Sequence, residues 1–157
     1  KYKNKYVMIY MLHNDNTVIE LANTISKLLN CRIVLFNDGN LRIPKGMSAK
    51  RFYDPSEFIR FIRDAEYVVT NSFHGTVFSV IFNKKFYTVP NKSKGSRIIN
   101  FCRKVGLEER IIYPDKQIER GDIIDNINYK DVNSNLEELR RVGLTYIENV
   151  LREVKHE

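Results

Sequence analysis

The residues with the clearest chemical potential form the stretch Thr70-Asn71-Ser72-Phe73-His74-Gly75-Thr76. An apolar run at residues 67–69 precedes it and predicts a buried strand, and an amphipathic run at residues 77–82 predicts a helix. We therefore expect His74 at a strand-to-helix turn, where the first N–H groups of the helix lack partners and favour an anionic ligand. A histidine there can donate to a phosphate or carry a proton near neutral pH. The alternative is a histidine that only caps the helix or packs locally.

The same stretch offers further groups for an anion. Ser72 adds a hydroxyl, and Gly75 would let the backbone approach a ligand closely because it has no side chain. Gly75 and Thr76 are expected to present the N–H groups of the first helical turn. The turn is thus a candidate for binding a phosphate or a carboxylate.

Ser96 and Arg97 form a second candidate anion site. They follow the basic loop Lys92-Ser93-Lys94-Gly95, and Ser96 is predicted to be the N-cap of the next helix. Adjacent strand-to-helix turns converge on one edge of a parallel sheet, so Arg97 and His74 can face the same ligand. A surface position for Arg97 is equally compatible with the sequence, and the two lysines of the loop are interpreted as solvated charges.

Two other polar features have open interpretations. The turn His13-Asn14-Asp15-Asn16 follows the first predicted strand, so it can contact a ligand at the same edge or reach another domain. A plain turn with helix-capping residues explains it just as well. Arg110, which follows the helix-ending Gly106, is interpreted as a structural residue.

An alternation of strands and helices is predicted to position these residues, which is typical of a mainly parallel sheet. Four strands are expected, at residues 6–12, 32–36, 67–69 and 86–89. A polar loop is expected at residues 37–51 and irregular structure at residues 107–133. The helix boundaries are predicted from capping residues: the turn at residues 14–16, Asn30, Asp54, Gly106 and Ser134.

The 157 residues fit one Rossmann-like α/β domain, an open parallel sheet flanked by helices. Its core is expected within residues 5–112, and a C-terminal helix within residues 134–155. A dinucleotide site is disfavoured because the sequence lacks the GxGxxG pattern. The missing initiator Met and the early first strand favour a fragment of a longer protein.

Composition excludes several classes of site. Cys31 and Cys102 are predicted to be buried free thiols, which favours a reducing compartment such as the cytoplasm. The histidines are far apart and no HExxH pattern occurs, so we expect neither a metal nor a cofactor. No apolar run approaches the roughly 20 residues of a membrane span, and no signal peptide is predicted.

The formal net charge of +7 is concentrated in the middle of the chain. Lys and Arg outnumber Asp and Glu by six to two in residues 42–63, and again in residues 92–110. The sequence contains no recognisable nucleic-acid motif, so no nucleic-acid partner is expected. A small anionic substrate or peripheral contact with an anionic membrane surface explains the charge equally well.

The sequence resembles the C-terminal half of polysaccharide pyruvyl transferases over about residues 51–112. The residues that carry the resemblance are Pro55-Ser56-Glu57-Phe58-Ile59, the segment from Asp64 to Gly75, the segment from Val77 to Phe86, Ser96-Arg97-Ile98, and the segment from Val105 to Arg110. The histidine of that family falls on His74. Many members carry an arginine two positions before it, where this sequence has Ser72.

The resemblance implies the donor-binding half of a two-domain, glycosyltransferase-B-like enzyme whose N-terminal domain lies outside this chain. Such enzymes transfer pyruvate from phosphoenolpyruvate to two hydroxyls of a sugar as a ketal. The acceptor it implies is a lipid-linked or nucleotide-activated precursor of a bacterial surface polysaccharide, handled in the cytoplasm or at the inner face of the membrane. It also implies that His74 acts as phosphate ligand and general acid, and that the isolated chain is inactive.

Two other functions remain compatible with the sequence. One keeps the fold but makes the donor a nucleotide sugar, as in a glycosyltransferase; no acidic residue near His74 stands out for holding a ribose. The other is a non-catalytic module that binds an anionic glycan or membrane face, for which the cations of residues 42–63 would matter and His74 would not.

Overall fold

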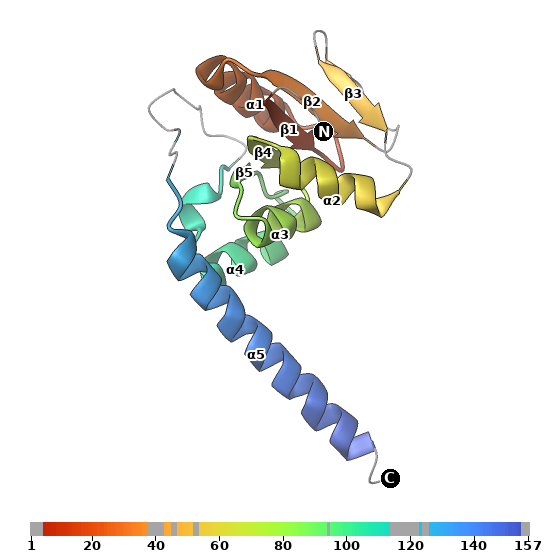
Figure 1. The fold of residues 1–157 in the computed structure, drawn as a ribbon, viewed down its shortest axis with the longest axis vertical. Helices are drawn as coiled ribbons and strands as arrows, with labels where there is room; N and C mark the ends of the chain where they lie inside the picture. Colours follow the sequence, from red (N-terminus) through yellow and green to blue (C-terminus); the bar gives the residue numbers. More distant parts are fainter. Residues whose placement is uncertain are drawn as a thin grey trace.

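Five parallel strands form one sheet in the order β3-β2-β1-β4-β5 (Figure 1). The computed structural model describes residues 5–37, 43–44, 47–51, 54–93, 95–113, 123 and 126–154. The strands are β1 Tyr6–Tyr10, β2 Arg32–Asn37, β3 Ser48–Arg51, β4 Tyr67–Thr70 and β5 Lys85–Thr88. The predicted parallel Rossmann-like sheet is confirmed, and four of its strands lie close to where the sequence predicted them.

The expectation of four strands was wrong, because β3 lies within the segment that was predicted to be a loop. Its sequence, Ser-Ala-Lys-Arg, has no run of apolar or β-branched residues that would indicate a strand. It forms by pairing with β2, from Val34 opposite Ser48 to Asn37 opposite Arg51, at the edge of the sheet. Residues 38–42 and 45–46 of the predicted loop lie outside the described residues, as do Lys94 and most of residues 114–125.

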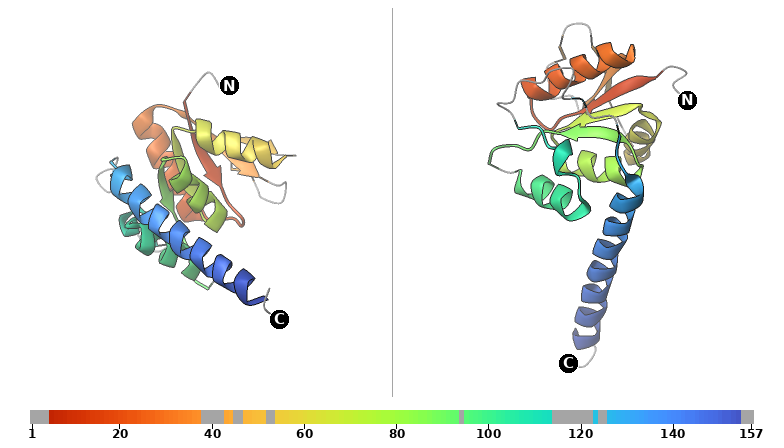
Figure 2. Two further views of the ribbon diagram at one scale, coloured as in Figure 1. Left: turned by 60° about the horizontal axis from the view of Figure 1, so that its bottom comes forward. Right: turned by 90° about the vertical axis from the view of Figure 1, so that its left-hand side faces the viewer.

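Helices cover both faces of the sheet (Figures 1 and 2). They are α1 Asn16–Leu29, α2 Pro55–Asp64, α3 Phe73–Ile81, α4 Ser96–Val105 and α5 Tyr129–Val154, with a short 3-10 helix, η1, at Glu108–Arg110. The apolar side of α1 packs on one face with Val7, Ile9 and Val69. On the other face, α2, α3, α4 and the start of α5 pack around Met8, Val68 and Phe86.

Local capping sets most of the helix boundaries. The Asp15 carboxylate accepts from the N–H of Thr17 at 2.9 Å, and the Asp54 carboxylate from the N–H of Ser56 at 2.8 Å. Asn30 and Gly106 end α1 and α4 in the left-handed conformation, as their positions predicted. The predicted cap at Ser96 was wrong: Gly95 is the N-cap of α4, it makes no side-chain capping bond, and Ser96 is the first helical residue.

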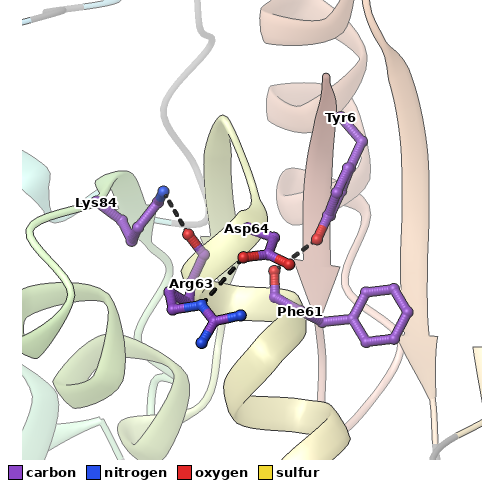
Figure 3. Close-up of polar contacts among 5 residues, drawn as sticks. All are labelled: Tyr6, Phe61, Arg63, Asp64 and Lys84. Carbon is purple, nitrogen blue, oxygen red and sulfur yellow. Dashed lines mark hydrogen bonds and ion pairs between the residues drawn. The ribbon is translucent and has the colours of Figure 1, made fainter. Parts of the chain in front are cut away.

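Two side-chain donors, the buried Tyr6 and the half-buried Lys84, hold the C-terminal end of α2 (Figure 3). The hydroxyl of Tyr6 donates to the carbonyl of Phe61 at 2.7 Å, and the Lys84 ammonium donates to the carbonyl of Arg63 at 3.0 Å. Carbonyls in the last turn of a helix lack intrahelical partners, and Lys84 satisfies that of Arg63. The Phe61 carbonyl accepts both from Tyr6 and from the backbone N–H of Ala65, at 3.1 Å. Desolvation by burial lowers the pKa of Lys84. The contacts fix the chain just before β4, the strand that leads into the His74 turn.

The last helix begins earlier than predicted. It starts at Tyr129 rather than Ser134 because tertiary contacts hold its first turn: the Tyr129 hydroxyl donates to the carbonyl of Lys84, and Val132 is buried in the core. Beyond these residues, α5 extends away from the rest of the molecule (Figures 1 and 2). Its apolar side chains from Val142 onward are exposed.

Arg110 is buried beside β5 and does not line the pocket of about 330 Å³ that contains His74. Its guanidinium lies 5.4 Å from the centre of the Tyr87 ring and donates to the carbonyl of Asn126 at 2.5 Å. Its Nε lies 3.6 Å from a carboxylate oxygen of Glu109. These contacts agree with the structural role expected for this residue.

The two cysteines are free thiols in different environments. Cys102, on α4, is buried in the core, and burial raises the pKa of its thiol to about 12. Cys31, predicted to be buried, is only half-buried, between α1 and β2. Desolvation also raises the pKa of the Cys31 thiol.

Alkylation should separate the two thiols. At about pH 8 we expect iodoacetamide to modify Cys31 in the folded protein, because its side chain reaches solvent and the thiolate is the nucleophile. Cys102 should react only at the rate at which the protein opens. Mass spectrometry of wild type and of Cys31→Ser measures both rates, with urea-unfolded protein as the control in which both thiols react. Equal labelling of the two thiols in the folded protein would contradict the buried position of Cys102.

Candidate functional site

A pocket of about 330 Å³ lies at the carboxyl ends of β1, β4 and β5. β1 pairs with β2 on one side and with β4 on the other, so the pocket lies where the order of the strands reverses. Ligands of open α/β sheets bind at this position. The pocket is lined by Leu12, His13, Asn71, Phe73, His74, Asn91, Gly95, Arg97 and Ile98.

His74 and Arg97 meet around the ring of Phe73. Both side chains are exposed and each belongs to the second residue of its helix, α3 for His74 and α4 for Arg97. The Arg97 guanidinium lies 5.2 Å from the centre of the Phe73 ring, and the His74 ring is edge-on to it at 5.9 Å. The structure therefore brings the two predicted anion-binding residues into one pocket, as expected from their positions on successive strand-to-helix turns.

Ser72, Gly75 and Thr76 lie beneath the pocket, and none of them lines it. Ser72 is the N-cap of α3, and its hydroxyl oxygen accepts from the N–H of Gly75 at 3.4 Å. The Thr76 hydroxyl donates to the carbonyl of Ser72 at 3.0 Å and lies 2.8 Å from the hydroxyl of Thr88 on β5. These residues hold the first turn of α3 against the sheet.

Gly75 allows a close approach between α3 and the strand ends. A Cβ atom at this position would lie 2.4 Å from the hydroxyl oxygen of Thr70 and 3.0 Å from a ring carbon of Tyr10. Thr70 has little room to move, because its hydroxyl donates to the carbonyl of Tyr10 at 2.7 Å and accepts from the N–H of Ser72 at 3.0 Å. The Cβ position of Gly75 thus faces the interior of the protein.

The start of α4 is also held close to the sheet edge. A Cβ at Gly95 would lie 2.5 Å from the carbonyl oxygen of Asn91, so this glycine lets α4 begin close to the backbone that follows β5. Gly95 lines the pocket, and its neighbour Ser96 is exposed and does not. Of the two residues predicted at this turn, the pocket therefore contains only Arg97.

Three polar side chains, His13, Asn71 and Asn91, form a cluster that the sequence did not predict as a unit. The Asn71 amide oxygen accepts from the N–H of Leu12 at 2.9 Å, and its nitrogen donates to the carbonyl of His13 at 3.2 Å. The amide nitrogens of Asn71 and Asn91 each lie 3.4 Å from Nε2 of His13. Each of the three residues follows a parallel strand, and this was the signal in the sequence, because such positions meet at one edge.

The electrostatics of the pocket suit an anion. Arg97 supplies a permanent positive charge, and the N–H groups of Phe73 and His74 begin α3 without acceptors inside the helix. Among the described residues that line the pocket, none is Asp or Glu. In the described part of the chain, no three His, Cys, Asp or Glu side chains are grouped so that they could hold a metal ion. None of the described helices has both the length and the apolar character needed to cross a membrane.

Residues 1–93 match the sequence model of the polysaccharide pyruvyl transferase family. This chain belongs to that family. The match includes β1 to β5 with His13, Asn71, His74 and Asn91, and it ends before Arg97. It therefore extends to the first residue of the chain, beyond the motifs of residues 51–112 that carried the resemblance. No curated protein matches the sequence significantly.

Solved structures with a similar fold are glycosyltransferases. The glycotransferase of kitacinnamycin aligns with 88% of this chain at a TM-score of 0.58 and 15% identity, over 39% of its own length. SnogD from Streptomyces nogalater aligns with 89% at 0.53 and 9% identity, over 40% of its length. The heptosyltransferase TibC, solved with ADP-D-β-D-heptose, aligns with 90% at 0.50 and 12% identity, over 46% of its length.

These likenesses concern the fold. They agree with an α/β Rossmann-like domain of the glycosyltransferase-B kind, and this chain spans less than half of each of the three proteins.

Replacing Gly75 by Ala should destabilise the fold by about 1–3 kcal/mol, because the added methyl group overlaps the buried Thr70 hydroxyl. Gly143 provides the matched control. It is exposed within α5 and has no atom within 4 Å of an added Cβ, so Gly143→Ala should stabilise the helix by about 0.5–1 kcal/mol. Urea unfolding of both variants measures the two effects. An unchanged midpoint for Gly75→Ala would contradict the close contact of α3 with β4.

Proposed function

We propose that this chain is the C-terminal, donor-binding half of a polysaccharide pyruvyl transferase that transfers pyruvate from phosphoenolpyruvate to a sugar as a ketal. The observation that carries the proposal is the pocket in which His74 and Arg97 both contact Phe73 beside the open N-terminus of α3. Membership of the family supports the same reaction.

Phosphoenolpyruvate is a small ligand that carries about three negative charges near neutral pH, which call for charge-assisted donors. In the proposed complex, the N–H groups of Phe73 and His74 bind the phosphate and the Arg97 guanidinium binds the phosphate or the carboxylate in a bidentate manner. Arg97 thereby provides the arginine that many members carry at the position of Ser72. The contributions of Ser72, Gly75 and Thr76 are indirect, since they fix the turn that presents these donors.

In the proposed reaction His74 gives a proton to the methylene carbon of the enol, which becomes the methyl group of the ketal. The adjacent carbon then resembles an oxocarbenium ion. One sugar hydroxyl attacks it and loses its proton, phosphate leaves with the electrons of its C–O bond, and the second hydroxyl attacks in turn. General acid catalysis of this type contributes roughly 10²- to 10⁴-fold to a rate.

The acceptor and the base that deprotonates its hydroxyls belong, in this proposal, to an N-terminal domain outside this chain. Two observations support a larger enzyme: this chain spans less than half of each of the three similar structures, and the apolar side chains of α5 from Val142 onward are exposed. The acceptor would be a lipid-linked or nucleotide-activated precursor of a surface polysaccharide. The enzyme would act in the cytoplasm, at the inner face of the membrane where the acceptor is lipid-linked.

A nucleotide-sugar transferase is the second candidate, favoured by the glycosyltransferase neighbours, one of which was solved with ADP-heptose. A site for a nucleotide commonly uses a carboxylate to bind the ribose hydroxyls. The described lining of this pocket contains none, so the pocket better suits a small anion.

Thermal-shift titrations with phosphoenolpyruvate, inorganic phosphate, UDP, ADP and UDP-sugars test the proposal. At 100 times its dissociation constant, a ligand stabilises the folded state by about 2.7 kcal/mol. We expect a saturable shift with phosphoenolpyruvate that exceeds the shift with phosphate. Loss of Arg97 in Arg97→Ala should weaken binding about ten- to a hundredfold, because a hydrogen bond to a charged group is lost. His74→Ala should weaken it as well.

Arg103→Ala is the matched control, since Arg103 is an exposed arginine on α4 that does not line the pocket. It should bind phosphoenolpyruvate as wild type does. A shift with nucleotides alone would favour the second candidate and reject the first. The absence of any shift with phosphoenolpyruvate would argue against a donor site on this chain.

A further inference from the structure

His13 is a titratable residue of the pocket to which the proposed function gives no role. It lies three positions after the end of β1, is half-buried, and lines the pocket together with His74 and Arg97. Its imidazole contacts amide side chains from two other strand ends, through Nε2. These two contacts restrict the orientation of the His13 imidazole. A restricted orientation is characteristic of a residue that positions a ligand.

The orientation of the Asn71 amide is fixed independently of His13. The backbone N–H of Leu12 can only donate, and it lies 2.9 Å from Oδ1 of Asn71, so this atom is the oxygen. The other end of the amide is then the NH₂ group. It donates one proton to the carbonyl of His13 and directs the second toward Nε2 of the same residue.

The same reasoning fixes the Asn91 amide. Its Oδ1 accepts from the backbone N–H of Ser93 at 2.9 Å and from the Ser93 hydroxyl at 2.8 Å. The NH₂ group of Asn91 therefore points toward Nε2 of His13, at 3.4 Å. Two amide NH₂ groups from different strand ends face the same ring nitrogen.

Nε2 of His13 must then act as an acceptor, and in a neutral imidazole the proton lies on the other nitrogen. We propose that His13 is held as the Nδ1–H tautomer and donates this N–H to an oxygen of the anion bound in the pocket. The inference rests on the proposed function for the identity of the anion, but the tautomer does not depend on it. Among the described residues, no acceptor for Nδ1 of His13 is found.

The two histidines of the pocket, His13 and His74, would then have different chemical roles. His13 is a fixed hydrogen-bond donor, because Nε2 is occupied by the two amides and Nδ1 already carries its proton. His74 contacts the ring of Phe73, and the described part of the chain makes no hydrogen bond to its imidazole. The proton transfer of the proposed reaction is thereby assigned to His74 and the binding of a substrate oxygen to His13.

The tautomer can be measured without any ligand. Long-range ¹H–¹⁵N correlation spectra of the ¹⁵N-labelled chain show which ring nitrogen of a neutral histidine carries the proton, and the spectrum of His13→Asn identifies the signals of His13. We expect Nδ1–H in wild type. A proton on Nε2 would overturn the inference whatever the substrate is.

Two variants test the donated N–H. In His13→Asn the side-chain NH₂ group can occupy the position of Nδ1, whereas in His13→Gln it reaches the position of Nε2 and leaves no donor at Nδ1. Titrations with phosphoenolpyruvate and with inorganic phosphate should show affinity near that of wild type for His13→Asn. His13→Gln should lose about tenfold or more, the effect of one hydrogen bond to a charged group. Thermal unfolding of both variants checks that the fold is retained.

The outcomes separate this inference from the proposed function. If wild type binds phosphate but not phosphoenolpyruvate, the proposed donor substrate is rejected. Phosphate titrations of His13→Asn and His13→Gln then still test the role of His13. Equal losses in the two folded variants would overturn the assignment of the donor to Nδ1. If wild type binds neither anion, the role of His13 in anion binding is rejected together with the donor site.

Discussion

The side chain of Asn71 joins the ends of the two central strands, and the arrangement of the pocket depends on this contact. Parallel pairing places Tyr10 opposite Thr70, and the Asn71 amide then bonds to both Leu12 and His13 just beyond the pair. The residues that follow each strand are thereby held at one edge of the sheet. This link adds to the strand pairing and to the bond from the Thr70 hydroxyl to the Tyr10 carbonyl, and it extends the connection to the turn after β1.

The first turn of α3 has two different sides. His74 is exposed, whereas Ser72, Gly75 and Thr76 are buried and closely packed. The backbone N–H of Ser72 donates to the Thr70 hydroxyl, and the Thr76 hydroxyl lies 2.8 Å from the hydroxyl of Thr88. Gly75, which has no side chain, lets the first turn pack against Thr70. Phe73 and His74, whose N–H groups have no acceptor inside the helix, line the pocket. Ser72, Gly75 and Thr76 thus shape the pocket by holding the first turn of α3 in place, although none of their side chains lines it.

The long helix α5 shows how one apolar face can serve two surroundings. Val132, Leu136, Leu139, Val150 and Val154 fall on the same side at the helical period of about 3.6 residues. The first three pack on the core, whereas the last two lie beyond the body of the domain and are exposed. An exposed apolar surface of this kind agrees with the proposal that this domain works as part of a larger enzyme.

The sequence by itself determined the order of the helices and of four of the five strands, most helix ends and the turn that carries His74. These follow from local interactions: the caps at Asp15 and Asp54 bond to N–H groups two residues away, and Asn30 and Gly106 adopt the conformation that ends a helix. Only the tertiary structure decided the pairing of β3, the early start of α5, and which residues of the His74 turn reach the pocket. The contacts of His13 with Asn71 and Asn91 join residues 58 and 78 positions apart, and no local pattern encodes them because the pairing of the strands brings them together.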